Sequence, residues 1–150
     1  MLRPLLVPLI LYILACCYPA LEWSNSQKPN DIMLGLRALA LGWSGIFAGV
    51  FAWYANPLWF VSLILAGFRK PMWALTPSLI AIAISFTVYQ DIGRELPGDE
   101  GNVTKTAIIK LLPGCYVWFA SLISLPIAAL IEKLTYKTPP TNPTVYPGPV

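Results

Sequence analysis

Long apolar stretches, separated by short polar ones, follow one another along most of this chain. The first covers residues 5–21, the second begins at residue 33, and two more cover residues 71–89 and 106–131. An α-helix of roughly 20 apolar residues is long enough to cross the hydrocarbon layer of a bilayer. This pattern therefore predicts transmembrane helices at 5–21, 33–55, 71–89 and 106–131.

The second apolar stretch is too long for a single crossing. It runs from residue 33 to residue 68, and as one straight helix it would extend about 54 Å. Asn56-Pro57 divides it, because proline lacks a backbone N–H and disfavours helical geometry in the preceding residue. Residues 57–68 are then too few to cross, and we predict a half-helix there. The expected fold is all-α, a polytopic bundle of four transmembrane helices plus this half-helix; if residues 57–68 also cross, the bundle has five.

The basic residues predict the orientation of this bundle, because cytoplasmic loops carry an excess of Lys and Arg. With four crossings, the following basic residues share one side of the membrane: Arg3, Arg69, Lys70, Lys133 and Lys137. We expect that side to be cytoplasmic. In this interpretation residues 1–137 form one transmembrane domain, and residues 138–150 form a proline-rich tail. The five-crossing alternative also places the C-terminus in the cytoplasm.

Composition agrees with a membrane protein and narrows the chemistry. Hydrophobic residues make up 57% of the chain and charged residues 11%, outside the range of soluble domains. The net charge of +3 is not gathered into a basic patch, so nothing indicates nucleic-acid binding. The sequence has no histidine, the commonest general base and metal ligand. We expect no catalytic residue, no metal site and no cofactor, and therefore no enzyme.

A series of glycines marks the predicted helix 33–55. They are Gly35, Gly42, Gly45 and Gly49. Small side chains let helix backbones approach closely in lipid, and this approach stabilises helix association. The series predicts a packing face, either against other helices of this chain or against another protein or a second copy.

The Asn56-Pro57 break, with Trp53 and Tyr54 before it, is the second candidate site. In lipid, a non-helical turn is tolerated only where protein or water covers its backbone groups. We favour an interfacial turn, in which Trp53, Tyr54 and Trp59 form an aromatic belt at the headgroup level. One alternative is a discontinuous helix of the kind that binds substrates in transporters. Another is a protein-binding surface built on the same turn.

The stretches GWSGIFAGVFAWYANPLWF and GCYVWFASL resemble small uncharacterised multi-span proteins of bacterial inner membranes. The resemblance implies that location and no activity. We expect a non-catalytic integral membrane protein that binds a partner in or beside the lipid bilayer, as an accessory, assembly or immunity-type subunit. That partner is a foreign protein or a second copy of the chain. The alternative is a small channel or transporter subunit that acts as an oligomer.

Overall fold

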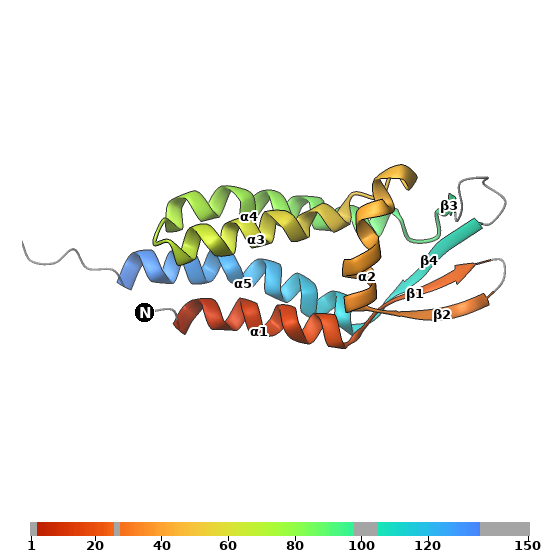
Figure 1. Ribbon diagram of the computed structural model, residues 1–150, viewed down its shortest axis with the longest axis horizontal. Coiled ribbons are helices and arrows are strands. Elements are labelled where there is room, and N and C mark those ends of the chain that lie inside the picture. Colours follow the sequence, from red (N-terminus) through yellow and green to blue (C-terminus); the bar gives the residue numbers. More distant parts are fainter. Residues whose placement is uncertain (1–2, 26–27, 98–104, 136–150) are drawn as a thin grey trace, which may run out of the picture.

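The computed structural model describes residues 3–25, 28–97 and 105–135, which form a helical bundle joined end to end with a small β-sheet (Figure 1). The α-helices are α1 (Arg3–Cys17), α2 (Gly35–Leu41), α3 (Ala55–Gly67), α4 (Pro71–Ser85) and α5 (Pro113–Thr135). The strands are β1 (Pro19–Asn25), β2 (Lys28–Leu34), β3 (Glu95–Pro97) and β4 (Lys105–Leu111). Three short 3₁₀-helices complete the described part: η1 (Gly42–Ala48), η2 (Ala52–Tyr54) and η3 (Phe86–Gln90). The predicted tail at 138–150 lies outside the described residues.

The all-α prediction is wrong, because the chain contains a four-stranded antiparallel sheet with the strand order β2-β1-β4-β3. β1 and β4 replace the ends of two segments expected to be helical, and β2 covers the first two residues of a third. Pro19 follows the end of α1, where a residue without an N–H cannot continue the helical hydrogen bonds. At the other segment, the β-branched Ile108 and Ile109 lie in β4, where such side chains fit a pleated sheet. Because these strand residues continue apolar segments, hydropathy alone did not reveal the change from helix to strand.

The predicted helix 33–55 does not form. The chain leaves β2 at Leu34, makes only two turns of α2, and tightens into η1. η1 ends at Gly49, whose φ of 71° is a left-handed conformation that glycine adopts without steric cost. Among the described residues, two helices are long and apolar enough to cross a membrane: Pro71–Gln90, which joins α4 to η3, and Pro113–Thr135. The prediction of four or five transmembrane helices is therefore wrong.

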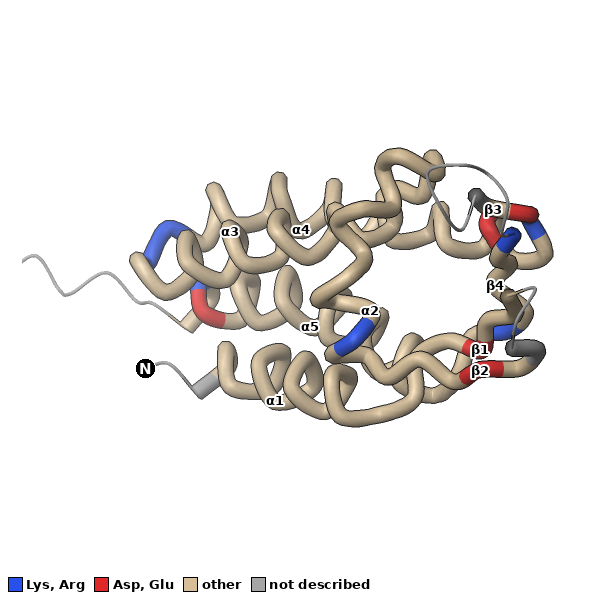
Figure 2. The backbone as a smooth tube through the Cα atoms, turned by 45° about the vertical axis from the view of Figure 1, so that its right-hand side comes forward, with Lys and Arg blue, Asp and Glu red and all other residues tan. Residues whose placement is uncertain are grey.

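The four longer helices, α1, α3, α4 and α5, run side by side away from the sheet (Figure 1). α1 leads directly into β1, and β4 leads directly into α5, so the sheet continues from this pair of helices. The start of α1, the α3–α4 connection and the end of α5 all lie at the opposite end of the bundle (Figure 1). That connection carries Arg69 and Lys70, and the last turn of α5 carries Lys133 (Figure 2). We call this end of the bundle the basic end.

The interior of the bundle contains small residues and hydroxyl groups. Ser62 Oγ donates a hydrogen bond to the Ala74 carbonyl at 2.9 Å, which joins α3 to α4. Ser121 Oγ donates to the Pro8 carbonyl at 3.0 Å, which joins α5 to α1. Trp59 fills the space between the helices and is fully buried. These two serine hydroxyls in the core therefore bond to neighbouring helices instead of facing solvent.

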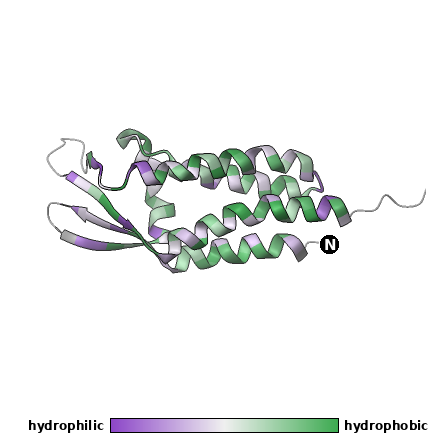
Figure 3. Ribbon diagram, turned by 180° about the vertical axis from the view of Figure 1, so that it is seen from behind, coloured by the Kyte–Doolittle hydropathy of each residue, from purple (hydrophilic) through white to green (hydrophobic). Residues whose placement is uncertain are grey.

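The outer surface of the bundle is apolar, whereas the sheet is more polar (Figure 3). Large apolar side chains are exposed on all four long helices, among them Leu6, Ile10, Ile13, Val61, Ile64, Trp73, Leu79, Tyr116, Ile123, Ile127 and Leu134. A soluble monomer seldom exposes apolar patches larger than a few hundred Å². The bundle thus has hydroxyls inside and hydrocarbon outside.

The contact between α2 and α1 depends on Gly35. Its N–H donates to the Tyr18 carbonyl at 3.0 Å, and a Cβ built there would lie 2.0 Å from the Ala15 carbonyl oxygen. We expect Gly35→Ala to force α2 away from α1 and to lower the free energy of unfolding by about 1 to 3 kcal/mol. Gly67→Ala is the matched control, because no atom lies within 4 Å of a Cβ at that position. Equal melting temperatures of the two variants in one detergent would contradict this close approach.

Candidate functional site

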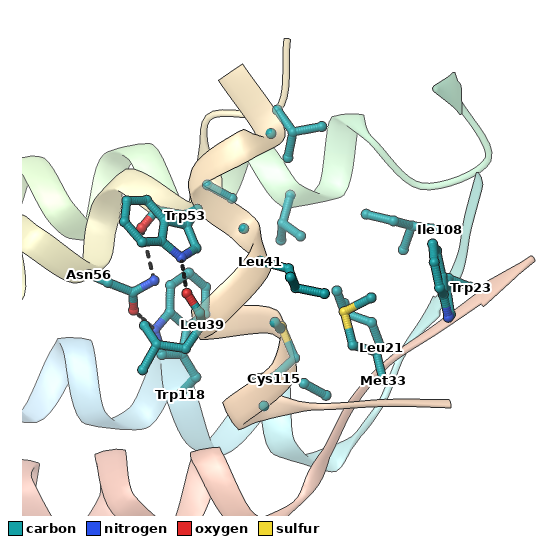
Figure 4. A pocket seen from close by; sticks show the side chains of 18 of the residues that line it. Leu21, Trp23, Met33, Leu39, Leu41, Trp53, Asn56, Ile108, Cys115 and Trp118 are labelled. Carbon is teal, nitrogen blue, oxygen red and sulfur yellow. Dashed lines mark hydrogen bonds between the residues drawn. The ribbon is translucent and has the colours of Figure 1, made fainter. Parts of the chain in front are cut away.

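A cavity of about 1060 Å³ lies where the bundle meets the sheet (Figure 4). α1 and α5 contribute Cys16 and Cys115 to its wall, and the sheet contributes Leu21 and Ile108. The segment from α2 to η2, residues 35–54, closes another side, and we call it the covering segment. Cavities that bind small molecules measure roughly 300 to 1000 Å³, so this one is large enough for a sizeable ligand.

Asn56 lies at the bundle end of the cavity and holds three helices together. Its Oδ1 accepts hydrogen bonds from Tyr12 Oη of α1 and from Trp118 Nε1 of α5, each at 2.9 Å. Its Nδ2 donates to the Trp53 carbonyl at 2.8 Å. The residue is only 6% exposed, so these bonds replace water almost completely. The Asn56 amide therefore connects α3 with α1 and α5 at one point.

Trp53 connects the covering segment to this amide. Its indole Nε1 donates to the Leu39 carbonyl at 2.7 Å, and its carbonyl accepts from Asn56 (Figure 4). Gly42 leaves room for the Trp53 ring within the covering segment, because a Cβ there would lie 2.1 Å from Trp53 Cδ1. Tyr54 adds a weaker contact through its hydroxyl, which donates to the Trp43 carbonyl at 3.3 Å.

The structure places Pro57 in the first turn of α3, where the missing N–H has no helical partner to lose. The Asn-Pro pair therefore begins a helix, and the chain reverses earlier, at Gly49. Asn56 is buried, and Trp59 is fully buried and stacks on Tyr12 with 4.3 Å between ring centroids. These positions do not fit an exposed turn with an aromatic belt.

The four predicted glycines do not form one helix face, because they are distributed over α2, η1 and the turn after it. Gly35, Gly42 and Gly45 line the cavity, and each approaches another part of this chain. For Gly45 that part is Val50, whose carbonyl oxygen would lie 3.1 Å from a Cβ. Gly49 lies beside the Arg94 guanidinium, 3.2 Å from the position of a Cβ. Their close contacts thus form the covering segment and attach it to the molecule.

Asp91, which the sequence did not single out, is buried just beyond η3. It is 3% exposed; its Oδ1 lies 3.4 Å from Arg94 Nη1, and its Oδ2 has no hydrogen-bond partner within the described residues. Burial raises the pKa of this carboxyl group, and the nearby Arg94 offsets part of that rise. The residue does not line the cavity.

The cavity offers binding chemistry. In the part of the chain that the structure describes, no three Cys, Asp or Glu residues are grouped so that they could hold a metal ion. No protein-family model matches the chain, and searches of curated proteins and of solved structures found no significant similarity. Interpretation of the site therefore depends on its own geometry, which is a partly open cavity with an apolar wall and one hydrogen-bonded amide at its end.

The Asn56 amide can be tested by removing it. Asn56→Ala leaves the Tyr12 hydroxyl and the Trp118 indole N–H without their acceptor, and we expect a loss of about 1 to 3 kcal/mol in the free energy of unfolding. Tyr12→Phe removes a single donor and should destabilise less. Tyr116→Phe, at an exposed tyrosine of α5, is the matched control. Equal melting temperatures of all three variants in one detergent would contradict the role of Asn56 in holding α1, α3 and α5 together.

Asp91 should make stability depend on pH. Because the folded state raises its pKa, the ionised carboxylate destabilises the fold. This destabilisation is absent below the unfolded-state pKa of about 3.9, develops as pH rises, and is complete above the folded-state pKa. We therefore expect Asp91→Asn to gain stability relative to the parent as pH rises from about 4 to about 7. Arg94→Gln should lose stability over the same range; parallel melting curves of all three proteins would contradict this burial cost.

Proposed function

We propose that this chain is a non-catalytic integral membrane protein that acts by binding, with its bundle in the bilayer and its sheet outside. The supporting observation is the apolar outer surface of the bundle, which contrasts with the sheet (Figure 3). Burying one Leu, Ile or Phe side chain contributes roughly 1.5 to 3 kcal/mol. In water, the exposed apolar side chains of the bundle would lack this stabilisation, whereas surrounding lipid would provide it.

Helix length and core chemistry support the same location. Pro71–Gln90 and Pro113–Thr135 are long enough to cross the hydrocarbon layer, and the shorter α1 and α3 pack beside them. Inside the bundle, Ser62, Ser78 and Ser121 bond to backbone carbonyls of their own or neighbouring helices. Such bonds and close contacts between small residues associate helices where lipid tails remove the hydrophobic driving force.

The basic end gives the bundle a direction in the membrane. Arg69, Lys70 and Lys133 lie there, and the described N-terminal end of α1 lies there too (Figure 2). Cytoplasmic loops carry such an excess of positive charge. The basic end, and with it the C-terminus, is therefore on the cytoplasmic side, and the sheet and cavity are on the opposite side.

The cavity is where this protein binds. It combines an apolar wall with a position at the junction of bundle and sheet, which is the level of the bilayer surface in this orientation. Catalysis would require nucleophiles, acids or bases that converge on a reacting atom. The described lining has the thiols of Cys16 and Cys115 and the hydroxyls of Tyr12, Ser44 and Thr106, but no carboxylate, amine or imidazole that could act as a base on them, so we assign the cavity to recognition.

Location and orientation can be tested together in a bacterial host. Cys16, Cys17 and Cys115 are replaced by alanine, and one new cysteine is introduced by Lys110→Cys in the sheet or by Lys70→Cys at the basic end. We expect both variants to stay in the membrane after an alkaline carbonate wash. A membrane-impermeant maleimide should label the sheet variant on intact spheroplasts and the basic-end variant only after permeabilisation. Release by carbonate would refute the membrane location, and equal or inverted labelling would refute the orientation.

A further inference from the structure

We propose that the cavity holds an acyl chain of a membrane phospholipid, which enters from the bilayer past the covering segment. This inference rests on the proposed membrane location and adds to it the class of the bound molecule. Three features of the cavity carry it: its polar groups, its mouth and its size.

The polar side chains that line the cavity bond to other parts of the protein. Asn56 accepts from Tyr12 and Trp118, as described above. Ser44 Oγ donates to the Leu41 carbonyl at 2.8 Å, and Thr106 Oγ1 lies 3.4 Å from the Leu96 carbonyl. The described lining includes no charged residue. A sugar or nucleotide would enter without partners for its polar groups, at a cost of about 1 to 3 kcal/mol for each group. The wall therefore favours hydrocarbon.

The mouth of the cavity is apolar as well. Leu41 and Phe47 line the cavity and are also 50% and 81% exposed, so the covering segment forms the inner wall and the outer surface with the same side chains. Leu36, Trp43 and Ile46 expose further apolar surface on this segment. The exposed side of the covering segment is thus apolar, like the bundle surface that we assign to lipid, and we expect a bilayer chain to enter there.

The cavity leaves room for a phospholipid chain whose headgroup stays outside. Its volume is about 1060 Å³, and its apolar lining atoms gain dispersion partners from a flexible hydrocarbon chain. Beside the lining residue Trp23, the Arg37 guanidinium lies 5.8 Å from the ring centroid and is half-exposed. Its contact with Asp31, at 3.7 Å, is an exposed pair of the kind that contributes little. Arg37 therefore places a cation near the cavity where a lipid phosphate can meet it.

A matched pair of substitutions on α2 tests the occupant. Ala38 lines the cavity, whereas Ala40 of the same helix is exposed and does not. Each protein is purified in mild detergent and washed, and native mass spectrometry measures the fraction that retains phospholipid. We expect the parent and Ala40→Trp to retain one phospholipid each, and Ala38→Trp to retain about tenfold less because the indole occupies the cavity. Loss of lipid from neither variant or from both, or retention of free fatty acid alone, would overturn the proposal.

A second measurement uses the parent chain, so it does not depend on how Ala38→Trp folds. A phosphatidylcholine with a photoreactive diazirine at the end of one acyl chain is reconstituted with the protein, irradiated, and located by peptide mass spectrometry. We expect adducts at Leu21 and Ile108, which line the cavity from the sheet. Adducts confined to the outer surface of the bundle would overturn the acyl-chain proposal while leaving the membrane location intact. A protein released by carbonate would instead refute the membrane location on which the inference rests.

Discussion

The hydrogen bonds of one buried amide hold three helices and the covering segment together at the bundle end of the cavity. Asn56 Oδ1 is the acceptor for groups on α1 and α5, and its Nδ2 fixes the backbone at Trp53. Trp53 in turn holds α2 through the Leu39 carbonyl. These contacts hold the covering segment beside the cavity, whose other walls come from the sheet and from α1 and α5. An apolar residue at position 56 would leave the helices without this common point.

The core of the bundle combines small residues with a few large ones. Alanines and serines line much of it, Trp59, Leu122 and Leu125 are buried among them, and many other bulky side chains are exposed. Small residues bring the backbones together, so dispersion and hydroxyl bonds add to the burial of these large side chains. Ser62 and Ser78 show this at the α3–α4 contact, where Ser78 Oγ lies 2.9 Å from Ser62 Oγ and 2.8 Å from the Ala74 carbonyl.

Part of this architecture could be predicted from the sequence. Segment 71–89 is apolar and became a continuous helical element. The Asn-Pro pair, predicted to be a break before a half-helix at 57–68, lies instead in the first turn of α3, which begins at Ala55. The strands were missed because an apolar stretch that continues from a helix into a strand shows no loss of hydropathy, only a change of period. The prediction of a helix at 33–55 was wrong for another reason. The glycines that indicated helix packing also permitted the 3₁₀ turns and the reversal at Gly49. Asn56 could be singled out from the sequence, but its hydrogen-bond partners could not, since Tyr12 and Trp118 lie 44 and 62 positions away.

Because α1 leads directly into β1 and β4 leads directly into α5, a movement of the sheet is transmitted to these two helices. At this junction Gly114 lies against the backbone of Tyr18 and Pro19, and the Leu112 N–H donates to the Ala20 carbonyl at 2.9 Å. There is no loop there to absorb movement, so a tilt of the sheet turns α1 and α5 together. α3 and the covering segment are attached to these two helices through Asn56 at the other side of the cavity. A partner that pulled on the sheet would therefore strain the hydrogen bonds of the Asn56 amide and change the width of the cavity.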